Sequence, residues 1–154
     1  MQNYPRKIDR NNYTKAFLMK IISILSDHLI MSQGYGVVAT ILKREILEMG
    51  KGNARELKKN LEITEINQKN ALSYLKIIAE ALDYDVNIKD NSIAVKNCPF
   101  GIIAKNSKKK IICELCTNYC DGVTEELLGK IYKIKSDHDL DNNNVKCLFK
   151  IQKI

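Results

Sequence analysis

The spacing of apolar residues predicts that the chain begins with an amphipathic helix. From Asn12 onward, apolar side chains recur every three or four residues, which is the repeat of one helix face. The residues on this stripe are Phe17, Leu18, Ile21, Ile22, Leu25, His28 and Leu29. We expect a loose tail before this helix and a break at Gln33-Gly34-Tyr35-Gly36, because glycine disfavours a helix interior.

The helical period continues through three further segments. The second predicted helix has its apolar positions in Val37–Met49 and should end at Gly50-Lys51-Gly52, because glycine readily adopts the left-handed conformation of a helix end. A short third helix is expected over Asn53–Leu61 and a fourth over Thr64–Leu82, each starting at a residue that can cap a helix. The first half of the chain is therefore predicted to be helical.

The period then changes to the alternation that is typical of strands. Val86 and Ile88 alternate with polar residues, and so do Ile93 and Val95. Asp90-Asn91 lies between the two runs, and both residue types tolerate the positive φ angles of a tight turn. These residues predict a short β-hairpin.

The rest of the chain is predicted to contain a loop, a helix and two strands. A lysine-rich loop over residues 105–110 precedes a helix over Ile111–Leu128, which Gly129 should close. Two strands follow, Tyr132–Ser136 and Val145–Ile154, joined by an Asp/Asn-rich loop. One face of the last strand should carry Val145, Cys147, Phe149 and Ile151.

This order of elements predicts the α+β fold class, in which a helical N-terminal half is followed by a small antiparallel sheet with a cysteine-bearing helix. A chain of 154 residues is long enough for one domain with its own core. We expect residues 1–32 to form a tail and an amphipathic helix. Residues 33–154 should form the domain itself.

Charge and hydropathy narrow the class of protein. The net charge of +7 is spread along the chain, and its densest run, residues 105–110, contains no arginine or aromatic residue. A solvated loop is therefore favoured over a nucleic-acid site. No segment approaches the roughly 20 apolar residues of a membrane span, and residues 1–7 lack the features of a secretory signal. We expect a cytoplasmic protein.

Five cysteines, all in the last third of the chain, are the candidate chemistry. They are Cys98, Cys113, Cys116, Cys120 and Cys147. Disulfides are rare in the cytoplasm, and five thiols cannot pair completely within one chain. Three of the cysteines share one side of the predicted helix, one ends a strand, and one lies on the inner face of the last strand. Such sulfurs can converge on a metal.

Zinc is the metal expected at this site, because thiolates with or without histidine satisfy its four-coordinate geometry. An iron–sulfur cluster needs the same ligands and is the alternative. His138, in the predicted loop before the last strand, also allows a Cys₃His set. The remaining interpretation is that the cysteines pack as small apolar core residues.

The order of several short motifs resembles the vinyl-reductase (4-vinyl reductase, or hydrocarbon-binding) domain family over roughly residues 33 to 152. The motifs are Asn97-Cys98-Pro99-Phe100, then Cys116 on a helix that runs to Leu127-Leu128-Gly129, then Cys147-Leu148-Phe149-Lys150-Ile151. The chain looks most like an archaeal stand-alone member of that family.

The resemblance implies an α+β fold, a homodimer, and binding of a small apolar or tetrapyrrole-like ligand. Members of the family are related in fold to vesicle-tethering subunits that hold an acyl chain and to haem-based gas sensors. Relatives often carry another cysteine before the last strand, where this chain has Ser136-Asp137-His138-Asp139. Three alternatives are open: His138 replaces that cysteine, Cys113 and Cys120 complete the set, or the site is lost.

Two other functions are weighed against ligand binding. Asn53–Leu61, Thr64–Leu82 and the hairpin Val86–Val95 can be interpreted as the helices and wing of a DNA-binding transcription regulator. An enzyme is disfavoured, because the chain has no nucleophile elbow, phosphate-binding loop or dinucleotide-binding glycine motif. The sequence therefore predicts a small-molecule-binding or sensing domain with a cysteine-rich metal site.

Overall fold

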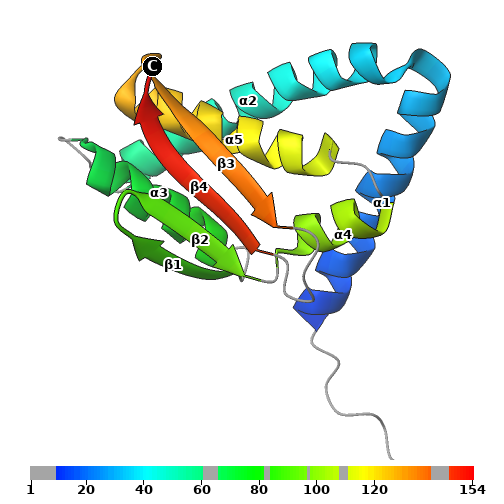
Figure 1. Ribbon diagram of the computed structural model, residues 1–154, viewed down its shortest axis with the longest axis horizontal. Coiled ribbons are helices and arrows are strands. Elements are labelled where there is room, and N and C mark those ends of the chain that lie inside the picture. Colours follow the sequence, from blue (N-terminus) through cyan, green and yellow to red (C-terminus); the bar gives the residue numbers. More distant parts are fainter. Residues whose placement is uncertain (1–9, 61–65, 82–83, 97, 108–110, 140–145) are drawn as a thin grey trace, which may run out of the picture.

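A computed structural model of the protein describes residues 10–60, 66–81, 84–96, 98–107, 111–139 and 146–154 (Figure 1). Its elements in chain order are α1 (Arg10–Gln33), α2 (Tyr35–Asn60), α3 (Gln68–Ala81), β1 (Asp85–Lys89), β2 (Ser92–Lys96), α4 (Pro99–Ser107), α5 (Ile111–Leu128), β3 (Tyr132–Asp139) and β4 (Lys146–Lys153). The predicted α+β class, with a helical first half and a small antiparallel sheet, is confirmed. None of the helices within these residues is long and apolar enough to cross a membrane.

The four strands form one antiparallel sheet in the order β1-β2-β4-β3. Helices α3 and α5 pack against the same face of this sheet, and α2 lies behind α5 (Figure 1). The predicted alternation in the last strand is confirmed, because Cys147, Phe149 and Ile151 are buried while the residues between them are exposed. Val145, which was expected on the same face, lies outside the described residues.

The break after the first helix is where the sequence predicted it. Gly34 has a φ of +84° between α1 and α2, and its backbone N–H donates a hydrogen bond of 2.9 Å to the carbonyl of Ile30. A left-handed glycine that closes the last turn is a common helix end.

The predicted end of the second helix at Gly50-Lys51-Gly52 is wrong, because α2 continues to Asn60 and includes the expected third helix. Tertiary packing explains the difference. A Cβ atom on Gly50 would collide with the carbonyl oxygen of Tyr119 in α5, and a Cβ on Gly122 would collide with that of Leu47. These glycines therefore let the backbones of α2 and α5 approach each other, which local propensity does not reveal.

The short hairpin is confirmed as β1 and β2, with Asp90 at a φ of 50° in the turn. The helix before it, α3, begins at Gln68 and not at Thr64. The side-chain oxygen of Asn67 accepts a hydrogen bond of 3.0 Å from the Asn70 backbone, so Asn67 caps this helix. Thr64 itself lies outside the described residues.

The winged-helix arrangement is also wrong. Residues 53–60 belong to α2, and β2 of the expected wing pairs with β4 inside the sheet. Leu72 and Leu75 of the expected recognition helix are buried in the core. The apolar face of α3 therefore packs against the sheet.

Helix α4 was not predicted. It begins at Pro99 and contains Lys105, which the sequence placed in a loop, while residues 108–110 of that loop lie outside the described residues. Proline suits the first position of a helix because its missing N–H has no partner there in any case. The carbonyl of Cys98 accepts a hydrogen bond of 3.0 Å from Ile102, which marks the start of this helix.

The cysteine-bearing helix has the predicted bounds, Ile111–Leu128, and Gly129 closes it with a φ of +97°. The next strand is longer than expected, since β3 continues to Asp139. His138 therefore lies in the sheet, directly opposite Cys147 of β4, and not in a loop. The expected Asp/Asn-rich connection is shorter, and residues 140–145 lie outside the described residues.

Candidate functional site

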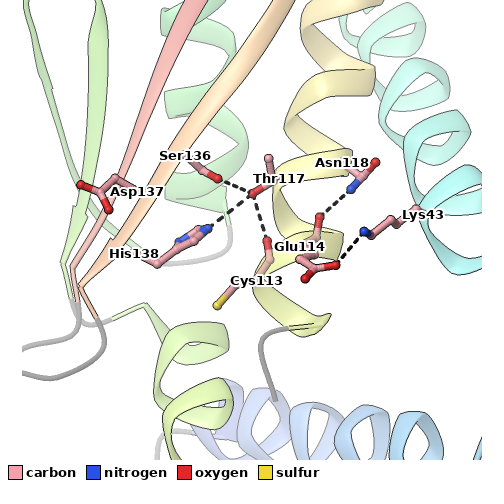
Figure 2. A pocket seen from close by; sticks show the side chains of 8 residues that line it. All are labelled: Lys43, Cys113, Glu114, Thr117, Asn118, Ser136, Asp137 and His138. Atoms are coloured by element: carbon pink, nitrogen blue, oxygen red, sulfur yellow. Dashed lines mark hydrogen bonds and ion pairs between the residues drawn. The ribbon is translucent and has the colours of Figure 1, made fainter. Parts of the chain in front are cut away.

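A pocket of about 370 Å³ lies between helix α5 and strand β3 (Figure 2). Its lining side chains are all polar or sulfur-containing: Lys43, Cys113, Glu114, Thr117, Asn118, Ser136, Asp137 and His138. In Figure 2, Ser136 and His138 of β3 face Thr117 of α5, whereas Asp137 points away from that helix. This volume lies at the small end of the range for ligand pockets.

An ion pair closes the side of the pocket that faces α2. Lys43 Nζ lies 2.7 Å from Glu114 Oε2, and the hydroxyl of Tyr35 donates a hydrogen bond of 3.1 Å to Glu114 Oε1. Bonding to Glu114 raises the pKa of Lys43, while burial, followed by Glu114, raises the pKa of Tyr35. Glu114 thus accepts bonds from both Lys43 and Tyr35 at the pocket wall.

Hydroxyl groups form a second wall. Thr117 Oγ1 donates a hydrogen bond of 3.0 Å to the carbonyl of Cys113, and it lies 2.8 Å from Ser136 Oγ. Because the single proton of Thr117 goes to the carbonyl, Ser136 donates to Thr117. The oxygen of Ser136 therefore keeps acceptor capacity at the pocket.

His138 lies where this pocket meets the cysteines. Its Nε2 is 3.5 Å from Thr117 Oγ1, and its Nδ1 is 3.3 Å from the sulfur of Cys147. The ring also packs edge-on against Phe149, with 5.9 Å between the centroids. Packing and both contacts hold the imidazole in one orientation.

Cys98 and Cys147 form a hydrogen-bonded thiol pair behind His138. Both are buried. The hydrogen bond from Cys147, with further bonds from the backbone of Gly101 and Phe100, lowers the pKa of Cys98 to about 7. The same bond to Cys98, together with burial, raises the pKa of Cys147. Cys98 is thus the more acidic member of the pair.

Cys116 and Cys120 form a second hydrogen-bonded pair on α5. Bonding to Cys120 and burial raise the pKa of Cys116 well above the ordinary value. Cys113 is buried on the same helix, and both it and Cys116 are close enough to Cys147 for their charges to raise its pKa. Cys98, Cys113, Cys116 and Cys147 are therefore near one another, and Cys120 adjoins Cys116.

Proximity of the cysteines does not by itself make a preformed metal site. Within the described residues, no group of three or more His, Cys, Asp and Glu side chains is arranged so that it could hold a metal ion. None of these thiols forms a disulfide, and they lie as two pairs with Cys113 nearby.

Most of the residues that line the pocket were not predicted as site residues. Thr117 follows Cys113 by one helical turn, so it could have been placed beside the cysteines from spacing alone. Lys43 and Ser136 carry no such local signal, because they reach the site only through the packing of α2 against α5 and of α5 against β3.

Two solved structures share this fold. The crystal structure of trafficking protein particle complex subunit 3 from Naegleria fowleri, covalently bound to palmitic acid, matches with a TM-score of 0.56 and 10% identity, covering 89% of this chain and 96% of that chain. The phenol-responsive sensory domain of the transcription activator PoxR, solved with phenol, matches with a TM-score of 0.57 and 15% identity, covering 86% and 73%. The chain is therefore an α+β domain of the fold that these proteins share.

The family is shown by sequence. Residues 17–152 match the family described as Methanogen output domain 1, and the chain belongs to that family. The match includes most of α1, so the family's sequence pattern extends into the helix that we separated from the domain at residue 32. A comparison with curated proteins gave no match.

Proposed function

We propose that this protein is a small-molecule-binding or sensing domain and that its ligand occupies the pocket between α5 and β3. The observation that carries the proposal is the pocket itself, in which polar side chains from α2, α5 and β3 converge on one cavity. Two proteins of the same fold support it, since their structures hold phenol and palmitic acid.

The lining favours a small polar ligand over a long apolar one. No lining side chain is a hydrocarbon, and Glu114 and Ser136 offer acceptor oxygens. A ligand with a hydroxyl or amine group could donate to Ser136 and keep the Lys43–Glu114 pair solvated or bonded, whereas an acyl chain would bury this polar lining against hydrocarbon. The apolar or tetrapyrrole-like ligand that the vinyl-reductase resemblance implies therefore fits less well.

Titration calorimetry tests this proposal with phenol, benzylamine, benzoate and palmitate as probes. We expect at least one donor-bearing probe, phenol or benzylamine, to bind and to raise the melting temperature of the protein. Ser136→Leu should fill the pocket and abolish binding. Lys135→Leu is the matched control, because Lys135 is exposed on the opposite face of the same strand. Equal loss of binding in both variants would place the ligand elsewhere.

We further propose that the cysteines hold zinc, with an iron–sulfur cluster as the alternative. Thiolates and imidazole are the donors that zinc prefers. Cys147 already contacts both Cys98 and His138. Cys113 and Cys116 are the candidates for a fourth ligand, because both act on Cys147. Binding would require these thiols to lose their protons and to close around the ion. Cys120 pairs with Cys116 and would be left out.

Elemental analysis of protein purified without oxygen tests the metal proposal. About one zinc per chain is expected in the wild type, with loss in Cys98→Ser, Cys147→Ser and His138→Ala. Cys120→Ser should retain the metal and serves as the control. A wild-type protein that holds no zinc or iron would contradict the metal proposal and would leave the ligand proposal unaffected.

We also propose that the protein is a homodimer, as the resemblance implies. Among the described residues, eleven of the seventeen large apolar side chains that are exposed lie between residues 17 and 41 of α1 and α2. Half-exposed side chains of this size amount to on the order of 1,000 Å² of apolar surface, which is comparable to one side of a standard interface. A second copy of the chain can cover this surface.

The relation to the vinyl-reductase family remains a proposal beside the family that is shown. It is supported by the order of Cys98, Cys116 and Cys147 along the chain and by the small-ligand domains that share the fold. An archaeal source likewise remains a prediction from that resemblance.

A further inference from the structure

Strand β3 has a free backbone edge, because it lies at the end of the strand order β1-β2-β4-β3 and pairs only with β4. In an antiparallel pair, every second residue exchanges N–H and C=O bonds with the partner strand. The residues between them direct both backbone groups away from that strand. The register of β3 against β4 therefore identifies which N–H and C=O groups point to the free edge.

Two hydrogen bonds show which residues these are. The backbone N–H of Ile154 donates to the carbonyl of Ile131 at 2.8 Å, in continuation of the β3–β4 register, so the odd-numbered residues of β3 are the ones bonded to β4. The N–H of Ile134 donates instead to Oδ1 of Asp121 on α5, at 2.6 Å. The even-numbered residues thus direct their backbone groups outward, and Ser136 is the next of them along the strand.

Asp121 shows how an oxygen beside α5 can accept from an outward N–H. Thr117 lies one helical turn before Asp121, about 6 Å along the helix axis. Ser136 lies two residues after Ile134, about 7 Å along the strand. Thr117 therefore reaches Ser136, and their hydroxyl oxygens are 2.8 Å apart, but the Thr117 hydroxyl donates to the Cys113 carbonyl. Within the described residues, no protein oxygen takes at the Ser136 N–H the place that the carboxylate takes one step earlier.

The pocket reaches this part of the edge. Residues 136–138 all line it, although the side chain of Asp137 points away from α5 (Figure 2). A cavity that touches three consecutive residues of a strand contacts their main chain, because the middle side chain lies on the other face of the sheet. Ser136 is partly buried. Its N–H and its carbonyl are therefore an adjacent donor and acceptor at the wall of the cavity.

We propose that the ligand of this pocket is a small carboxamide or lactam, whose C=O accepts from the Ser136 N–H and whose N–H donates to the Ser136 carbonyl. This inference rests on the proposed function, because it names the class of ligand for the same pocket. A carboxamide presents an acceptor and a donor side by side on one planar group, as the backbone of an added strand does. It therefore matches the two outward groups of one extended residue.

The rest of the edge favours a small amide over a peptide strand. The N–H of Tyr132 donates to the Gly129 carbonyl at 3.1 Å, and the N–H of Ile134 donates to Asp121. These two outward groups precede Ser136 and are already bonded within the chain. An added strand would have to displace Asp121 in order to pair along β3, whereas a small amide needs only the cavity beside Ser136.

Titration calorimetry with benzamide and N,N-dimethylbenzamide tests the class of ligand. The two probes share the ring and the carbonyl, and only benzamide can donate, so benzamide should bind about ten-fold more tightly. Ser136→Pro removes the outward N–H and keeps the ladder to β4, since an edge strand tolerates proline where the N–H faces outward. This variant should bind benzamide about ten-fold more weakly than the wild type does. Ser136→Ala removes only the hydroxyl, so it is the matched control and should keep the preference for benzamide.

Amide-proton NMR of the wild type decides the question should Ser136→Pro fail to fold. Benzamide should move the Ser136 amide proton downfield and slow its exchange with solvent, whereas the Asp137 amide proton, which belongs to the ladder with β4, should change little. Failure of benzamide to bind, equal affinity for the two probes, or an unchanged Ser136 amide proton would overturn the inference. Phenol or benzylamine that binds in the pocket without any preference for benzamide would refute the carboxamide, and the proposed function would stand.

Discussion

Two regions of this protein distribute polar and apolar groups in opposite ways. In α1 and the first turns of α2, large apolar side chains such as Leu25 and Met31 are exposed. In the unit formed by α4, α5, β3 and β4, thiols, a threonine and an imidazole are wholly or partly buried. Exposed apolar surface indicates a missing partner, whereas buried polar groups cost stability and indicate chemistry. The first region is therefore interpreted as an interface and the second as the site.

The contact between α2 and α5 is the structural link between these regions and should give the largest effect. Gly122→Ala would place a Cβ against the backbone of Leu47, so we expect a loss of about 3 kcal/mol in the free energy of unfolding. Gly52→Ala is the matched control, since a Cβ at that exposed helical position meets nothing within 4 Å. It should stabilise the protein by about 0.5–1 kcal/mol. Urea denaturation measures both changes, and equal effects would contradict the close packing of the two helices.

If the exposed apolar surface of α1 and α2 is a dimer interface, a charge placed on it should dissociate the dimer without unfolding the chain. Leu25 is 57% exposed, so Leu25→Glu should leave the unfolding free energy of the single chain within about 0.5 kcal/mol. Sedimentation should show a monomer for this variant and a dimer for the wild type. The melting temperature of the wild type should rise with protein concentration and that of the variant should not. Lys20→Glu changes the charge of an exposed polar position on the same helix and should leave the dimer intact.

Two threonines of α5 differ in whether the hydroxyl is hydrogen-bonded, so they compare the cost in unfolding free energy of burying a bonded and an unbonded polar group. Within the described residues, the buried hydroxyl of Thr124 has no hydrogen-bond partner, so Thr124→Val should raise the unfolding free energy by about 1 kcal/mol. Thr117→Val removes a hydroxyl that is bonded to Cys113 and Ser136, and it should lower the same quantity by about 1 kcal/mol. Thermal or urea unfolding measures both, and effects of the same sign would show that the two sites do not differ as described.

The smallest effect is expected at the ion pairs between α2, α5 and β3. Glu125 pairs with Lys51 at 3.0 Å and with Lys133 at 3.5 Å, and the bond to Lys51 is the main cause that lowers the pKa of Glu125. A lowered carboxylate pKa stabilises the fold at neutral pH, and this contribution is lost as the pH falls through the folded-state pKa. Glu125→Gln should cost only about 0.3 kcal/mol at pH 7 and nothing in acid. Glu80→Gln, at an exposed helical pair with Lys76, should have almost no effect at either pH.

Local patterns predicted the elements whose ends depend on local chemistry. The bounds of α5 follow from the apolar period and from Gly129, and the hairpin follows from alternation around Asp90. The inward position of Cys147 was also accessible, because it follows from the alternation of apolar and polar residues along the last strand.

Features that depend on contacts between distant segments could not be predicted in this way. Continuation of α2 through Gly50 is favoured by the backbone of α5, which no window around Gly50 contains. His138 belongs to β3 because it pairs with Cys147, and the Asp/Asn-rich sequence around it favours a loop. Lys43 reaches the pocket only through helix packing. The polar cavity was therefore missed, and the cysteine metal site stays a prediction.

The central claim is that a small ligand binds between α5 and β3 and not on the apolar surface of α1 and α2. Backbone amide chemical shifts, recorded while the tightest-binding probe of the phenol, benzylamine, benzoate and palmitate set is added, test it most directly. We predict that the shifts change at residues 113–118 and 136–138 and stay constant at residues 17–41. Changes confined to residues 17–41, or no binding by any of the probes, would contradict it.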